Sequence, residues 1–186
     1  IVVYGLGTIG ILLTMFLKEA GVQNVLVIGN KEFQKQMVCK LGVSAEQYSD
    51  SRKKSAHDWI MQQTKGLGAD ILFECVGRNE TIRDAIACTA PEGIVQMVGN
   101  PASDIMLEKS VYWKVLRNQL TVRGSWNSSF AHEEQDDWHY VLRKLAEERI
   151  KPEQFITQRY TFANLEEGLH LMRDKAEEYV KVMAVR

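Results

Sequence analysis

The sequence predicts an α/β fold built on a doubly wound, six-stranded parallel sheet with helices on both faces. Segments with strand and helix patterns alternate from the first residue to about residue 150. The strand segments are continuous apolar runs, as in 25–28, which is typical of strands buried on both faces. A glycine-rich turn at residues 5–10 joins the first strand to the first helix. In such sheets a ligand binds outside the carboxyl ends of the strands.

Composition limits the functional classes that need considering. The chain has 186 residues, 45% hydrophobic and 25% charged, which are ordinary values for a globular protein. Its net charge of −1 gives no reason to expect nucleic acid or an anionic membrane as a partner. No apolar run approaches the roughly 20 residues that a membrane span requires. The three cysteines lack a C-x-x-C spacing, so we expect reduced thiols and a cytoplasmic protein.

The first ten residues, I-V-V-Y-G-L-G-T-I-G, contain the G-x-G-x-x-G spacing of the Rossmann dinucleotide-binding fingerprint. Gly5 permits the tight turn, Gly7 lets the backbone approach a pyrophosphate, and Gly10 allows the helix to pack on the strand. The N–H groups of Thr8 and Ile9 would face the anion at the positive end of the helix dipole. A glycine turn without a ligand is the other reading, but the strand before and the helix after favour a dinucleotide.

The remaining elements follow from apolar periodicity and from glycine or proline punctuation. Beyond the first strand we expect strands at 25–28, 46–50, 69–76, 94–98 and 120–124, with a turn at 91–93 before the fourth of them. We expect helices at 11–20, 31–41, 55–64, 80–89, 110–117 and 134–147. The last helix should face the core with Trp138, Val141, Leu142 and Leu145, and its charges should form a solvated face.

The sequence changes character after residue 150. We expect a strand at 155–160, a helix at 164–174 capped by Asn164, and a final strand at 179–185 that a six-stranded sheet does not need. The sequence thus predicts a dinucleotide-binding domain over 1–150 and a strand–helix–strand tail over 151–186. Because residue 1 already lies in a strand, we expect the chain to be a fragment whose tail belongs partly to another, absent domain.

Small or polar residues follow four of the predicted strands. Any one such cluster is common in turns, but four at successive strand ends predict a continuous surface, or floor, on which an extended ligand can bind. The clusters are Gly29-Asn30, Val76-Gly77-Arg78, Val98-Gly99-Asn100-Pro101 and Gly124-Ser125-Trp126-Asn127.

The end of the second strand bears on the choice of cofactor. NAD-binding domains usually place an acid there to accept hydrogen bonds from the ribose 2′-hydroxyl. This sequence has Gly29, followed by Asn30 and Lys31. Glycine leaves room for a 2′-phosphate, Asn30 donates hydrogen bonds, and Lys31 supplies positive charge, so the sequence favours NADP. In the alternative, Lys31 is an exposed residue at a helix start and NAD binds with one contact missing.

The sequence predicts neither catalytic residues nor a metal site. His57, His132, His139 and His170 do not form a ligand set with the three cysteines, and no Ser-His-Asp or Cys-His arrangement is indicated.

Four motifs together resemble the zinc-dependent medium-chain alcohol and polyol dehydrogenases. They are G-L-G-T-I-G from Gly5, E-C-V-G from Glu74, V-G-N-P from Val98 and L-T-V-R-G-S-W from Leu120. The longer run K-V-L-R-N-Q-L-T-V-R-G-S-W, from Lys114 to Trp126, looks most like the sorbitol and galactitol-1-phosphate dehydrogenase branch. The resemblance implies a two-domain enzyme whose other domain holds zinc, which lowers the pKa of the substrate alcohol so that hydride can pass to the nicotinamide. The present chain is then expected to bind the cofactor without turning over.

The resemblance also implies roles for individual residues. Thr8, Ile9 and Lys181 would contact the pyrophosphate, and Val76 with Arg78 would flank the adenosine. The backbone of Val98, Ser125 and Asn127 would fix the nicotinamide carboxamide. The departure from the pattern is Gly29, where the polyol branch has Asp; some relatives that use NADP carry a Gly-Ser-Arg run there instead.

The resemblance further implies a polyol or polyol phosphate as substrate and a homodimer or tetramer. The joining edge would comprise about 105–107 and 120–124, since an unpaired apolar edge strand is a liability. Two other readings stay open: a zinc-free reductase of the same superfamily, and a non-catalytic module that senses NAD(P). A methyltransferase is disfavoured because its ribose site also wants an acid where Gly29 stands.

Overall fold

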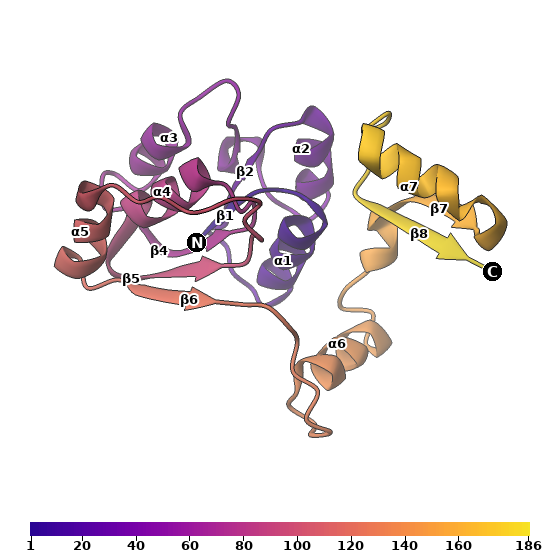
Figure 1. The fold of residues 1–186 in the computed structure, drawn as a ribbon. Coiled ribbons are helices and arrows are strands. Elements are labelled where there is room, and N and C mark those ends of the chain that lie inside the picture. Colours follow the sequence, from indigo (N-terminus) through magenta and orange to yellow (C-terminus); the bar gives the residue numbers. More distant parts are fainter.

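The computed structural model describes residues 1–186 (Figure 1). The strands are β1 (Val2–Tyr4), β2 (Leu26–Gly29), β3 (Tyr48–Asp50), β4 (Ala69–Glu74), β5 (Thr89–Met97) and β6 (Thr121–Gly124). The helices between them are α1 (Thr8–Glu19), α2 (Glu32–Cys39), α3 (Ala56–Gln63), α4 (Asn79–Cys88) and α5 (Lys109–Arg117). The chain then forms α6 (Asp137–Ala146), β7 (Ile156–Thr161), α7 (Leu165–Asp174) and β8 (Lys181–Val185).

The first six strands form one parallel sheet in the order β3-β2-β1-β4-β5-β6. This is the order of a doubly wound Rossmann sheet, with its topological switch point between β1 and β4. The predicted fold class is therefore confirmed. The strands β7 and β8 form a separate parallel pair.

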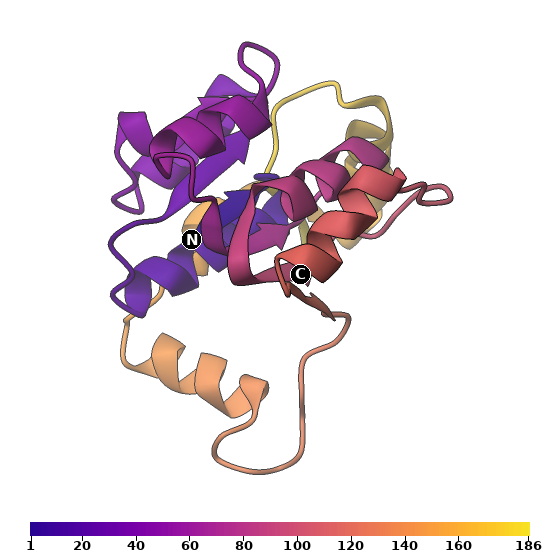
Figure 2. The same ribbon diagram turned by 90° about the vertical axis from the view of Figure 1, so that its left-hand side faces the viewer.

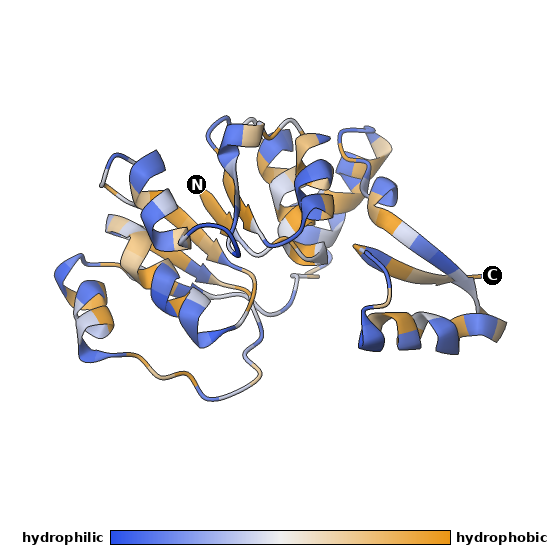
Figure 3. Cartoon of the chain, turned by 90° about the horizontal axis from the view of Figure 1, so that it is seen from above, coloured by the Kyte–Doolittle hydropathy of each residue, from blue (hydrophilic) through white to orange (hydrophobic).

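The sheet has a hydrophobic core on each face, because successive side chains of a strand point to opposite sides. Val2 and Tyr4 pack with buried residues of α3 and α4, whereas Val3 packs with those of α1 and α2. Figure 1 shows these two helix groups on opposite sides of the sheet. In Figure 3 the sheet strands are mainly hydrophobic while the helices carry both colours, as expected for strands covered on both faces.

The C-terminal tail is anchored in the core that α1 and α2 cover. Ile150, Phe155 and Val180 are all at least 96% buried within that cluster. The rest of the tail, with α7 packed on β7 and β8, projects to the right in Figure 1. No helix of the chain combines the length and apolarity needed to cross a membrane.

The expectation for the α6 face is wrong. Trp138 and Leu142 are 54% and 58% exposed, Leu145 is also exposed, and only Val141 packs against the core. Figures 1 and 2 both show α6 set off from the sheet at the end of a long loop. Polar contacts fasten this segment to α1 instead: Tyr140 donates to Glu19 at 3.1 Å, and Lys144 and Arg149 pair with the same carboxylate at 3.0 and 2.8 Å.

Two local expectations also need correction. The turn expected at 91–93 lies inside β5, which starts at Thr89 opposite Ala69 and changes register before Ile94. Asn164 does stand at the N-terminus of α7, but its side chain makes no capping hydrogen bond because a 3₁₀ turn, Phe162–Asn164, leads into the helix.

Candidate functional site

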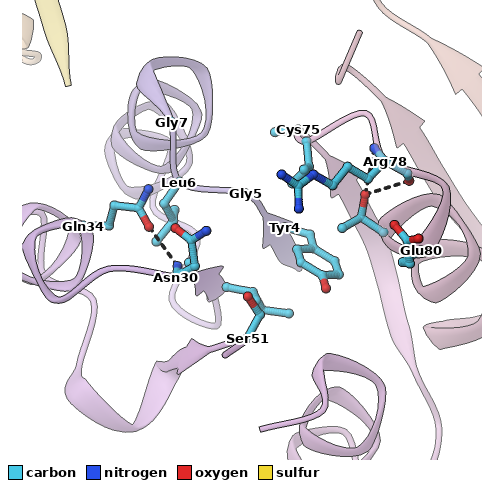
Figure 4. A pocket seen from close by; sticks show the side chains of 14 residues that line it. Tyr4, Gly5, Leu6, Gly7, Asn30, Gln34, Ser51, Cys75, Arg78 and Glu80 are labelled. Atoms are coloured by element: carbon cyan, nitrogen blue, oxygen red, sulfur yellow. Dashed lines mark hydrogen bonds between the residues drawn. The ribbon is translucent and has the colours of Figure 1, made fainter. Parts of the chain in front are cut away.

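A cleft of about 520 Å³ opens at the carboxyl ends of β1, β2 and β4, beside the switch point of the sheet. This is where open α/β sheets bind ligands. Figure 4 shows Asn30 and Gln34 on one side and Arg78 and Glu80 on the other, with Tyr4 between them. The lining residues are Tyr4, Gly5, Leu6, Gly7, Ile28, Gly29, Asn30, Gln34, Ser51, Cys75, Val76, Arg78, Glu80 and Thr81.

The glycine turn between β1 and α1 has the geometry that its spacing predicts. Gly5 has a φ of +104°, and a Cβ there would lie 2.5 Å from Cγ2 of Val76. A Cβ on Gly10 would overlap the carbonyl oxygen of Gly5, so α1 packs closely on the strand only because position 10 has no side chain. At Gly7, by contrast, nothing lies within 4 Å of the Cβ position, so the backbone is bare toward the cleft.

The N-terminus of α1 presents unpaired donors. The N–H groups of Thr8 and Ile9 donate to no acceptor in the chain, as expected in the first turn of a helix. The Thr8 hydroxyl donates to the carbonyl of Val180, so this end of the helix is held against the start of β8. An anion placed here meets free N–H groups at the positive end of the helix dipole.

Lys181 stands beside this helix end. It lines a second groove, of about 410 Å³, together with Thr8 and Leu12 of α1 and residues of the tail. Its exposed side chain therefore lies on the same part of the surface as the free N–H groups of α1. The structure brings Thr8 and Lys181 together although they are far apart in the sequence.

At the end of β2, a glutamine occupies the space beside Gly29. A Cβ on Gly29 would lie 2.7 Å from Oε1 of Gln34 and 3.0 Å from Cδ1 of Leu6. That same Gln34 oxygen accepts from the N–H of Asn30 at 2.9 Å. Lys31 points elsewhere, to Glu178, with Nζ and Oε2 3.2 Å apart. Sequence reasoning missed Gln34 and Glu178, since neither belongs to the glycine pattern.

The end of β4 is organised by the buried carboxylate of Glu74, which is 0% exposed. It accepts from the N–H groups of Val76 and Gly77 at 2.9 and 3.0 Å and from the Thr81 hydroxyl at 2.7 Å. Its backbone carbonyl accepts from the N–H groups of Val98 and Gly99, both at 2.8 Å. One residue thus fixes the turn after β4 and the end of β5. In the sequence, Glu74 stands out only as the first residue of the E-C-V-G motif, which does not predict its structural role.

Three predicted floor residues pack on one another and do not line the cleft. Gly77 has a φ of +78°, and a Cβ there would overlap the backbone of Asn100. A Cβ on Gly99 would overlap the N–H of Gly77 and lie 2.7 Å from Oε2 of Glu74. These glycines are required by close backbone packing at the junction of two strand ends.

The predicted nicotinamide half lies beyond the cleft. Ser125 continues the β5–β6 pairing through a 2.9 Å hydrogen bond from its N–H to the carbonyl of Met97. Trp126 is 79% exposed, and Asn127 is exposed as well. The cleft unites Gly5, Gly7, Gly29, Asn30, Val76 and Arg78; Val98, Ser125, Trp126 and Asn127 stand at neighbouring strand ends, and their contacts with a cofactor stay predictions.

The ionisable groups of the cleft suit binding better than catalysis. Burial raises the pKa of the Cys75 thiol to about 12, so it is not a nucleophile near neutral pH. Burial and the neighbouring Asp84 raise the pKa of Tyr4. Arg78 takes part in none of the ion pairs of the chain, and so its guanidinium is free to meet a ligand. No three His, Cys, Asp or Glu side chains gather closely enough to hold a metal ion.

Known proteins share both the sequence pattern and the fold. The chain is 25% identical to sorbitol dehydrogenase of Halalkalibacterium halodurans, over 98% of this chain and 50% of that protein. The galactitol-1-phosphate dehydrogenase structure from Escherichia coli aligns with a TM-score of 0.86 and 25% identity, over 100% of this chain and 53% of the other. The chain spans about half the length of the relatives it matches.

Two further solved structures hold dinucleotides. A zinc-binding dehydrogenase from Sinorhizobium meliloti bound to NADP aligns with a TM-score of 0.82 at 21% identity, over 100% of this chain and 52% of that one. A short chain alcohol dehydrogenase from E. coli complexed with NADH gives a TM-score of 0.82 at 18% identity, over 100% and 51%. At these identities the likeness establishes the fold alone.

The family comparison gives the strongest evidence of which family the chain belongs to. The model described as zinc-binding dehydrogenase matches residues 8–147, which is most of the chain and includes α1 and every later strand of the large sheet. The resemblance inferred from the four motifs is thereby confirmed, and the chain belongs to the zinc-binding dehydrogenase family.

Proposed function

We propose that this chain is the NAD(P)-binding part of an alcohol or polyol dehydrogenase. The observation that carries the proposal is the junction of β1 and α1, where Gly7 bares the backbone and the N–H groups of Thr8 and Ile9 are free. Such a junction at the switch point of a parallel sheet is the standard geometry for a pyrophosphate. The NADP and NADH held by structures of the same fold support it.

The bound cofactor supplies the nicotinamide ring that accepts or delivers hydride. The residues of this chain bind and orient it. Thr8 and Ile9 donate N–H groups to the pyrophosphate, and Lys181 adds a positive charge beside them. Val76 and Arg78 flank the adenosine, and the backbone at Val98, Ser125 and Asn127 holds the carboxamide.

Zinc, which the family name implies, does not fit the residues of this chain, because they contain no set of three ligands. We assign no zinc step to residues 1–186. In the proposed enzyme the metal is held outside this stretch of sequence, and the chain by itself binds cofactor without turning over substrate.

NADP is the cofactor favoured by the end of β2. Gly29 offers no carboxylate to repel a 2′-phosphate, and Asn30 lies in the cleft wall next to Lys31. Arg78 adds a cation without an ion-pair partner across the cleft. The competing assignment is NAD bound without the usual acidic contact to its ribose.

The substrate class and the cellular setting follow from weaker support. Relatives named sorbitol dehydrogenase and galactitol 1-phosphate 5-dehydrogenase favour a polyol or polyol phosphate. The three free cysteines, one of them exposed, favour the reducing cytoplasm.

The open edge of the large sheet favours a homodimer. β6 pairs only with β5, and its Val122 side chain is 44% exposed. Trp113 and Leu116 of the neighbouring α5 are exposed too. Joining two such edges would pair the free backbone groups and cover these side chains. Light scattering at tens of micromolar should give twice the chain mass, and a monomer would refute the dimer.

Calorimetric titration with NADP and NAD tests the cofactor site. Gly7→Val places a side chain in open space toward the pyrophosphate, so it should abolish binding while the melting temperature stays unchanged. Lys31→Ala should reduce the preference for NADP. Wild-type protein that binds neither dinucleotide contradicts the proposed function, whereas an unchanged preference in Lys31→Ala contradicts only the account of Lys31.

A further inference from the structure

Lys31, the cation that the sequence predicts to bind a 2′-phosphate, already forms an ion pair. Nζ of Lys31 lies 3.2 Å from Oε2 of Glu178, with side-chain exposures of 35% and 51%. Glu178 lies in the segment between α7 and β8, far from Lys31 in sequence. The tail thus places a carboxylate beside Lys31, the cation two residues after Gly29 that favoured NADP in the sequence.

A second cation, Arg52, is held by a different carboxylate. Asp50 holds this guanidinium with hydrogen bonds of 3.1 and 2.8 Å. The pKa of Arg52 is raised first by that hydrogen bond and, in smaller part, by the charge of Glu178. Lys31 and Arg52 each have a carboxylate partner, whereas Arg78, which lines the cleft itself, has none.

The two candidate cofactors differ at one group, the 2′ position of the adenosine ribose. A phosphomonoester carries about −1.5 to −2 charges at neutral pH, whereas a hydroxyl carries none. Glu178 repels that charge and competes with it for Lys31, but it has no such effect on a hydroxyl. We propose that Glu178 is a specificity-determining residue that lowers the affinity for NADP relative to NAD.

The inference rests on the proposed function, and charge-removing variants test it. Glu178→Gln keeps the size of the side chain and removes its charge. Glu177→Gln is the matched control, because the carboxylate of Glu177 is next in sequence to Glu178 but takes part in no ion pair. In calorimetry at low salt, Glu178→Gln should bind NADP about 3- to 10-fold more tightly, with NAD changed less than about 2-fold. The gain should shrink in 0.5 M salt because the charges lie at the surface.

A double-variant cycle identifies the mechanism. If Glu178 acts through Lys31, its substitution should give little gain for NADP when Lys31 is already Ala. An NADP-to-NAD affinity ratio in Glu178→Gln equal to that of Glu177→Gln would overturn the inference. Weaker NAD binding with NADP unchanged would also overturn it, since Glu178 would then be a ligand of the ribose. Failure of the proposed function looks different: the wild-type protein would bind neither dinucleotide.

Discussion

Replacement of Glu74 tests the strongest internal constraint on the cleft. In Glu74→Ala the part-buried N–H of Val76 and the buried N–H of Gly77 lose their acceptor, while the Thr81 hydroxyl can turn to the Arg78 carbonyl 2.9 Å away. A donor left unsatisfied away from water costs about 1–3 kcal/mol, so the two together should lower the free energy of unfolding by about 2–6 kcal/mol, with the larger share from Gly77. That is a large part of the roughly 5–15 kcal/mol typical of a domain.

Urea denaturation followed by circular dichroism measures this loss. Glu74→Gln keeps one oxygen for the donors that Oε1 accepts from. Its amide nitrogen replaces Oε2, which lies 3.1 Å from the N–H of Gly77 in the wild type, so two donors then face each other. The loss of stability in Glu74→Gln should therefore be intermediate. Glu80→Ala, an exposed carboxylate on α4, should change stability by less than about 0.5 kcal/mol. A Glu74→Ala protein within about 1 kcal/mol of wild type would refute the account of the turn.

Three further changes have expected outcomes. Gly10→Ala puts a methyl group onto the Gly5 carbonyl and should lower the free energy of unfolding by more than about 3 kcal/mol, whereas Gly7→Ala meets open space and should melt like wild type; equal melting temperatures would contradict this. Gly29→Asp requires the end of Gln34 to move, and its carboxylate should weaken NADP binding more than about tenfold relative to NAD in calorimetry; an unchanged ratio argues against a 2′-phosphate here. Although burial opposes ionisation, hydrogen bonds from His139 and Ala131 hold the pKa of Asp136 at about 2. The ionised Asp136 therefore stabilises the fold above about pH 4, and this stabilisation is lost as pH falls toward 2. In thermal melts, the melting temperature of Asp136→Asn should accordingly fall less than that of the wild type between about pH 4 and pH 2.

The sequence predicted well wherever local pattern and backbone chemistry coincide. The turn at Gly5 and the packing at Gly10 each depend on a few neighbouring residues whose steric needs can be read from the sequence. The parallel sheet was indicated by the alternation of strand and helix patterns along the chain. The family resemblance rested on the same short motifs and is confirmed.

Contacts between distant segments were not predictable in this way. The spacing of Trp138 and Leu142 correctly marks one face of α6, but periodicity does not say whether the sheet lies under that face. The structural role of Glu74 depends on donors from the turn after β4, from α4 and from the end of β5, and that of Gln34 on the missing side chain of Gly29. In each case the missing information is which partner the tertiary fold supplies.

The tail and the predicted phosphate contacts share the same few residues. Val180 holds the hydroxyl of Thr8, Lys181 follows it beside the N-terminus of α1, and Glu178 holds Lys31. The segment 178–181 therefore contacts both Thr8 and Lys31, which we propose to lie beside the pyrophosphate and the 2′ position of the ribose, and Val180 is itself buried in the core with α1 and α2. Because a phosphate bound at Lys31 or at the N-terminus of α1 would meet groups that also position this segment, we expect binding of a dinucleotide and placement of the tail to be energetically linked.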